Sequence, residues 1–224
     1  MQTLKVPKAP IVIKFGSEDN LKILQQGDLY VCPLKKYVVD EKLQIGIYDK
    51  SEGVSKCETV KKINGIKFTY EETFKVNLDY PIFCLYRPLY TRIDSVYKIK
   101  YEKDVFDEYS HALVIDANKL YEKISESCGN RYTMSYHDVI YKKCSKLIRA
   151  PFCKNEEFKK QNEVRYVFLD LENYLGKDKN GVEIYGPPII KIDGEILLHL
   201  GDLRSISKIV RKEYLNGLNF YVND

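Results

Sequence analysis

The sequence contains no tryptophan, two methionines and three histidines, and its six cysteines include no Cys-x-x-Cys pair. The histidines are scattered, so the sequence has no zinc-site signature and we expect no metal. The opening residues MQTLKVPKAP lack the apolar centre of a signal peptide, and no apolar run approaches the ~18 residues of a membrane span. Scattered cysteines without such a leader are typical of the reducing cytoplasm, where we place the protein, with no membrane partner.

The best-known catalytic signatures are absent as well. The patterns G-x-x-x-x-G-K-[ST], G-x-G-x-x-G, G-x-S-x-G and H-E-x-x-H do not occur. Their absence argues against P-loop NTPases, Rossmann dinucleotide-binding folds, α/β-hydrolases and zincin proteases. A Ser-His-Asp arrangement stays open, because geometry rather than spacing defines it.

Length and composition indicate one domain spanning residues 1–224. This length suffices to bury roughly 70% of the unfolded chain's surface, and the 44% hydrophobic content is ordinary for a globular protein. Nineteen tyrosines and nine phenylalanines favour half-buried strands. The net charge of +4, from 36 basic and 32 acidic residues, permits a nucleic-acid partner without requiring one.

The start of the chain predicts a strand–helix–strand unit. An apolar strand covers 10–15, and Ser17 then caps a helix whose first turn is acidic. Gly27 ends that helix, and a second strand follows at 28–32.

The rest of the chain predicts more strands than helices. Asn64-Gly65 and Asp193-Gly194 each separate two strand-like segments, which predicts two β-hairpins. A second helix follows Asp116 and ends at Gly129. The remaining strands are predicted at 81–90, 111–116, 131–142 and 164–170. We therefore expect an α+β fold with a mostly antiparallel, twisted sheet.

Gln161 and Glu163 lie at the start of the strand VRYVFLD. On extended backbone, residues two apart project to the same side, so the pair could bind a diol through carboxylate and amide. The alternative is a surface ion pair between Glu163 and Arg165, which contributes little to stability. Exposed glutamate is the more frequent case, so residue types alone favour the ion pair.

Two further segments could hold a nucleotide. The strand PIFCLYRPLYTR offers the ring of Tyr86 and the guanidinium of Arg87, which could stack on a base and bind phosphate. Lys14 and Phe15 end the first strand just before a helix N-terminus, where anions gather. The alternatives are a strand with tyrosine and arginine on its solvent face, and an ordinary strand end before a Gly-Ser cap.

The order of the segments along the chain resembles that of a known group of proteins. KFGS, a helix and DLYV are followed far downstream by IFCLY, HALVID, F-x-x-Q-N-E-x-R-Y-V-F and LHLGDLRSIS. Over roughly 11–210 this run resembles uncharacterised bacterial and phage proteins related to the ADP-ribosyltransferase superfamily. The resemblance implies a split, twisted β-sandwich that holds NAD in a cleft.

The resemblance also implies roles for residues. Glu163 would be the catalytic carboxylate beside the nicotinamide ribose, and Gln161 would orient the acceptor. Lys14 or Phe15 takes the place of the first-strand Arg or His, and Tyr86, with Arg87 beside it, takes that of the central element. This sequence has neither the Arg or His nor the serine of that element.

Three functions are consistent with these observations, and we favour the first because only it explains both the Gln-x-Glu placement and the order of the motifs. The first is an NAD-dependent ADP-ribosyltransferase, a toxin or phage-conflict factor whose acceptor is a protein or nucleic acid and which an antitoxin or chaperone could accompany. The second is a catalytically inactive module on the same fold that binds a nucleotide or a partner; it predicts that Glu163 is exposed or engaged by Arg165 and that tyrosine side chains fill the cleft. The third is a nucleic-acid-binding protein, which the mixed charge pattern disfavours.

Overall fold

The computed structural model describes residues 10–34, 54–63, 66–75, 80–93, 96–102, 104–141, 151–170, 174–177, 179, 181, 183–185 and 196–221. The predicted turns at Asn64-Gly65 and Asp193-Gly194 lie outside these residues. The strands on either side of the first turn are described, and they pair as an antiparallel hairpin. None of the helices in the described ranges is long and apolar enough to cross a membrane.

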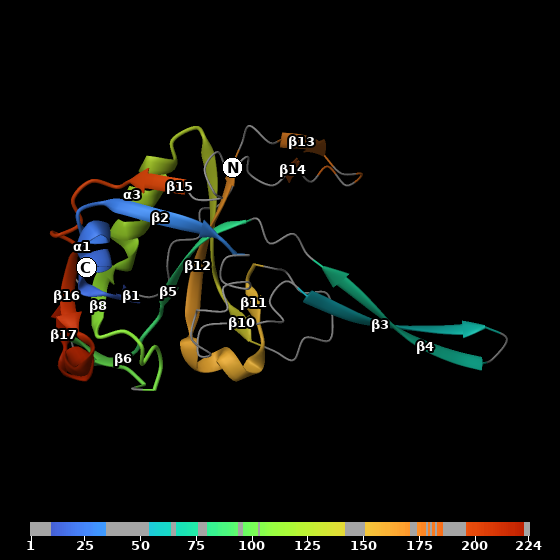
Figure 1. Ribbon diagram of the computed structural model, residues 1–224, viewed down its shortest axis with the longest axis horizontal. Coiled ribbons are helices and arrows are strands. Elements are labelled where there is room, and N and C mark those ends of the chain that lie inside the picture. Colours follow the sequence, from blue (N-terminus) through green and yellow to red (C-terminus); the bar gives the residue numbers. More distant parts are fainter. Residues whose placement is uncertain are drawn as a thin grey trace.

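An eight-stranded antiparallel sheet forms the centre of the fold (Figure 1). Its main path has the order β15-β2-β5-β1-β8-β16, and β12 pairs with both β5 and β9. The predicted α+β class with mostly antiparallel strands is therefore confirmed. The strands of this sheet are β1 (Ile11–Gly16), β2 (Asp28–Pro33), β5 (Pro81–Tyr86), β8 (His111–Asp116), β9 (Tyr132–Asp138), β12 (Glu163–Asp170), β15 (Ile196–His199) and β16 (Ser207–Arg211).

Smaller sheets and short helices surround this centre, and Figure 1 shows the β3–β4 hairpin projecting away from it. The smaller sheets comprise β3 (Val54–Ile63) with β4 (Ile66–Lys75), β6 (Leu89–Ile93) with β7 (Val96–Lys100) and β17 (Asn219–Tyr221), β10 (Ile140–Tyr141) with β11 (Cys153–Lys154), and β13 (Tyr174–Lys177) with β14 (Glu183–Tyr185). The helices are α1 (Glu18–Gln25), α3 (Ala117–Cys128), and the 3-10 helices η1 (Glu156–Gln161) and η3 (Lys212–Gly217).

The predicted strand–helix–strand unit is confirmed. The Ser17 hydroxyl accepts a hydrogen bond from the Asn20 amide and so caps α1. Leu21 and Leu24 are the buried face of this helix, and Gly27 follows it with a φ of +111°. Since β1 and β2 both run antiparallel to β5, they run parallel to each other.

The sheet forks at β5, because one edge of this strand serves two neighbours. Tyr86, at one end of β5, pairs with β12 and also with β1. Ile82, near the other end, pairs with β12 and also with β2. A strand residue has one neighbour on each side, so β12 follows one edge of β5 while β1 and β2 share the other. The two strands diverge from that shared edge.

Apolar clusters cover both faces of this sheet, because side chains alternate along each strand. On one face Val12 packs in the largest cluster, beneath α1 and α3. On the other face Ile13 and Phe15 belong to a second cluster, while Ile82 and Val167 belong to a third. The fork lies between the second and third clusters.

Replacing Gly27 by alanine should destabilise the fold strongly. A Cβ atom there would lie 2.2 Å from the Gly201 carbonyl oxygen, in a backbone conformation that alanine rarely adopts. We expect the free energy of unfolding, measured with denaturant, to fall by about 3 kcal/mol or more. Gly129→Ala is the matched control: its φ is +52° but its Cβ would meet nothing within 4 Å, so the loss should stay near ~1 kcal/mol. Equal losses would contradict this explanation.

Candidate functional site at the fork of the sheet

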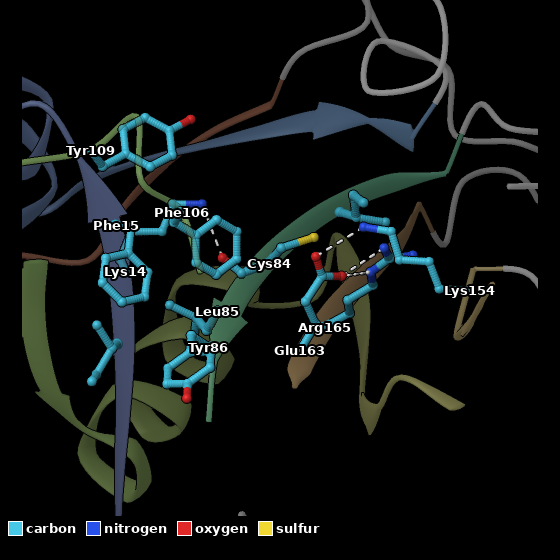
Figure 2. A pocket seen from close by; sticks show the side chains of 12 residues that line it. Lys14, Phe15, Cys84, Leu85, Tyr86, Phe106, Tyr109, Lys154, Glu163 and Arg165 are labelled. Carbon is cyan, nitrogen blue, oxygen red and sulfur yellow. Dashed lines mark hydrogen bonds and ion pairs between the residues drawn. The ribbon is translucent and has the colours of Figure 1, made fainter. Parts of the chain in front are cut away.

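A cavity of about 80 Å³ opens at the fork (Figure 2). Four of the six residues singled out from the sequence line it, namely Lys14, Phe15, Tyr86 and Glu163. They come from three strands that are far apart in the chain. The fork therefore brings most of the predicted positions together in one place.

Lys14 lies where the fork leaves β5 without a neighbour. Its ammonium donates a hydrogen bond of 2.9 Å to the carbonyl of Cys84, which has no strand partner on that edge within the described strands. The ammonium also lies 4.9 Å from the centre of the Phe83 ring. Lys14 forms no ion pair within the described part of the chain, and the carboxylate of Glu163 acts on it only at longer range. Burial lowers the pKa of Lys14 from its usual value.

Glu163 is held between two cations. Its Oε1 accepts a hydrogen bond of 3.1 Å from Lys154 Nζ, and its Oε2 accepts bonds of 3.1 and 2.8 Å from Nε and Nη2 of Arg165. Arg165 also donates through Nη1 to the Pro151 carbonyl at 2.6 Å. The side chains of all three charged residues are at least 94% buried. The ion pair between Glu163 and Arg165 exists, but it is buried and not a surface pair.

Alternation along the strand explains the placement of this cluster. Glu163, Arg165 and Val167 project from the same face of β12, and Val167 belongs to the third apolar cluster. Across the strand pair, Glu163 lies opposite Tyr86 and Arg165 lies opposite Cys84, both of which line the cavity. The charged cluster is thus enclosed between apolar side chains.

The side chain of Gln161 lies at the charged cluster, but its backbone is not the extended strand that was predicted. It ends the 3-10 helix η1, and Asn162 follows with a φ of +37°, so Gln161 and Glu163 do not lie on one extended strand. The expectation that extended backbone aligns them was wrong, because the left-handed residue turns the chain between them. Both side chains still meet at Lys154, whose Nζ donates to Gln161 Oε1 at 2.6 Å.

Arg87, the remaining predicted residue, lies outside the cavity lining. Its guanidinium forms a 2.8 Å ion pair with Asp138, and its backbone is hydrogen-bonded to Asn162. These contacts fix the turn that precedes Glu163. Arg87 therefore helps to position the start of β12.

Aromatic rings close the apolar side of the cavity. Phe106 stacks on Phe15 with ring centres 5.0 Å apart and an interplanar angle of 28°. Tyr86 meets both rings edge-on. Phe106 has a φ of +58°, a conformation that is rare for a bulky residue and costs about 1–3 kcal/mol. The surrounding contacts hold this ring in a strained position over the cavity.

The electrostatics favour an anion in this cavity. Burial alone would raise the pKa of Glu163, but the charges and hydrogen bonds of Lys154 and Arg165 hold it at about 2. A carboxylate with so low a pKa is a poor general base near neutral pH. Its negative charge is already balanced by these two cations, and Lys14 adds a third cationic group, which forms no ion pair with the described residues. A developing cation would therefore find little unbalanced negative charge on Glu163.

Sequence reasoning did not identify Lys154, Phe106 and Tyr109 as members of this site. Lys154 comes from the two-residue strand β11 and Phe106 from an irregular segment. The sequence signal that could have pointed to Lys154 is a charge directly after the apolar residues of PFC. No sequence signal of this kind points to Phe106.

Comparison with models of known protein families, with curated proteins and with solved structures yields no match to this chain. Any proposal about its function therefore depends on the geometry of the site and on the sequence pattern. Within the described ranges, no group of three or more histidine, cysteine, aspartate and glutamate residues is arranged to hold a metal ion.

The buried cluster should make stability depend on acid pH. The pKa of Glu163 falls from 4.5 to about 2 on folding, so its contribution is complete above about pH 4.5 and is lost as the pH falls toward 2. That contribution is on the order of 3 kcal/mol. Glu163→Gln should remove this part of the pH profile and, by taking away the buried carboxylate that pairs with Lys154 and Arg165, destabilise the protein at pH 7 by about 3–5 kcal/mol.

Denaturant unfolding between pH 2 and 7 measures this effect. Glu18→Gln is the control, because Glu18 is also ion-paired, with Lys22, but is exposed to solvent. It should leave the profile nearly unchanged. If the free energy of unfolding of Glu163→Gln changes with pH in parallel with that of the native chain, this carboxylate is not the source of the pH dependence.

Proposed function

We propose that this chain is a catalytically inactive module that binds an anionic nucleotide at the fork of its sheet. The observation that carries the proposal is Lys14, whose desolvated ammonium lines the cavity and forms no ion pair within the described part of the chain. Lys154 and Arg165 line the same cavity, where both are ion-paired with Glu163. Buried charge is costly unless it is balanced, and a phosphate group would supply the missing negative charge.

The aromatic side of the cavity supports a ligand with a flat ring. Phe15 has its face covered by Phe106 in a stacked arrangement, which a base or nicotinamide ring could replace. A cavity of about 80 Å³ is far below the ~300 Å³ of ordinary ligand pockets, so Phe106 must move before a nucleotide enters. Relief of the strain at its positive φ offsets part of the cost of that movement.

The resemblance to ADP-ribosyltransferases narrows the nucleotide to NAD or ADP-ribose. A split sheet with a ligand cleft is the architecture that the resemblance implies, and the fork at β5 supports it. Glu163 then acts by arranging Lys154 and Arg165 for the ligand, and its engagement by Arg165 favours the inactive module over a transferase.

An NAD-dependent ADP-ribosyltransferase, with a protein or nucleic acid as acceptor, is the second candidate. One observation favours it: Glu163, Tyr86 and the first-strand residues Lys14 and Phe15 line one cavity, as the resemblance implies. Against it stands the charge balance, because an oxocarbenium-like transition state needs a carboxylate whose charge is not already neutralised. Release of nicotinamide separates the two candidates.

Calorimetry with NAD, ADP-ribose, AMP and inorganic phosphate tests the proposal. We expect NAD or ADP-ribose to bind, and Lys14→Met to weaken binding at least tenfold because it removes a cation while keeping the apolar stem. Lys119→Met, which removes an exposed lysine of α3, should bind like the native chain. Phe106→Ala should bind more tightly, since it removes the ring that covers Phe15.

Chromatography of the same mixtures detects nicotinamide. Binding without nicotinamide release supports the module, whereas release by the native chain and not by Glu163→Gln supports the transferase. Thermal unfolding of each variant shows that it is folded. If the native chain binds none of the four compounds, or if Lys14→Met and the native chain bind equally well, the proposal fails.

A further inference from the structure

A second hollow lies away from the fork, between helix α1 and strand β16. It is a groove of about 420 Å³ lined by Glu18, Lys22 and Gln25 of α1, by His111 of β8 and by all five residues of β16. The three helix residues are spaced i, i+4 and i+7, so they form one stripe along the helix. The groove thus runs along both a helix face and a strand.

The side of β16 that faces this groove is a free edge of the sheet. β16 is the last strand on its path, and its inner side pairs with β8. The amide of Asp116 donates to the Ile206 carbonyl and the amide of Lys212 donates to the Ser110 carbonyl, so the backbone groups of residues with even numbers face β8.

The backbone groups of residues 207, 209 and 211 consequently face outward. Gln25 confirms this direction, because its side-chain amide reaches the Ser207 carbonyl at 3.3 Å and closes one end of the groove. Ile209 and Arg211 have no hydrogen-bond partner on this side within the described part of the chain. An extended peptide could pair with their N–H and C=O groups.

The charges around the groove select the chemistry of that peptide. Lys22, Lys208 and Arg211 carry three positive charges against the one carboxylate of Glu18. Glu18 is itself bound to Lys22 at 2.7 Å and lies 3.6 Å from His111 Nε2. Lys208 and Arg211 are exposed, and Arg211 also forms a solvent-exposed ion pair of 3.8 Å with Glu213, which a partner's carboxylate could replace. Complementary charge is the usual way in which such surfaces choose partners and speed their association.

We propose that the groove binds an extended, acidic peptide segment of a partner protein, which adds to the sheet as a strand beside β16. The backbone of the peptide pairs with Ile209 and Arg211. Its acidic side chains on the face toward α1 lie near Arg211 and Lys22. This interaction surface is separate from the fork, so it stands whether or not the fork binds a nucleotide.

Fluorescence anisotropy with a labelled hexapeptide of sequence Glu-Val-Glu-Val-Glu-Val tests the proposal. We expect saturable binding that weakens as salt is raised, and no binding of the Lys-Val-Lys-Val-Lys-Val counterpart. Arg211→Glu should weaken binding at least tenfold. Lys98→Glu, an equal charge change at an exposed residue of β7, should leave it unchanged within a factor of about two.

Methylation of the peptide backbone shows whether a strand is added. In an extended peptide the amides of alternate residues face the protein, so N-methylation of either the glutamates or the valines should abolish binding while the other set leaves it. The proposal is overturned if the acidic peptide does not bind at millimolar protein, if neither methylated set reduces binding, or if Arg211→Glu and Lys98→Glu weaken it equally.

Discussion

A six-residue strand, β5, gives one of its edges to two strands that diverge from it, and the polar groups at the centre of the fold are arranged around this shared edge. No described strand pairs with the middle of β5 on that edge, and a backbone carbonyl in such a position needs a donor. Lys14 supplies the donor through its ammonium. The cost is a positive charge in partly desolvated surroundings, which lowers the pKa of Lys14.

The ion cluster of Glu163, Lys154 and Arg165 lines the same cavity as Lys14. The charge balance within this cluster decides how much negative charge is left near Lys14. Glu163 is balanced by Lys154 and Arg165, so it has little negative charge left for Lys14 or for a developing cation. The fork is therefore suited to an anion, and the aromatic stack of Phe15 and Phe106 beside it is suited to a ring. The groove beside β16 has a different origin, because among the described strands the sheet ends there, and the backbone groups of Ile209 and Arg211 face outward beside a helix.

The sequence predicted those parts of the structure that depend on local pattern. The cap at Ser17, the buried stripe of Leu21 and Leu24 and the strand arms around Asn64-Gly65 follow from neighbouring residues, and the structure has them. The fork could not be predicted, since the shared edge of β5 depends on pairings between distant segments.

The site was predicted in part for the same reason. The order of segments indicated Lys14, Phe15, Tyr86 and Glu163, and the fold places them around one cavity. Lys154 was missed because only the folded chain brings β11 beside β12. The small size of the cavity depends on side-chain packing, which periodicity does not report.

The most direct test of the account is the pKa of Lys14, followed by the ¹³Cε chemical shift of the lysines with and without saturating ADP-ribose and assigned with Lys14→Met. The account predicts a pKa below the usual 10.5 in the free protein and a clear rise when the phosphate groups bind beside the ammonium. A pKa at its ordinary value in the free protein, unchanged by ADP-ribose, would contradict the claim that the fork holds a desolvated cation in need of an anion.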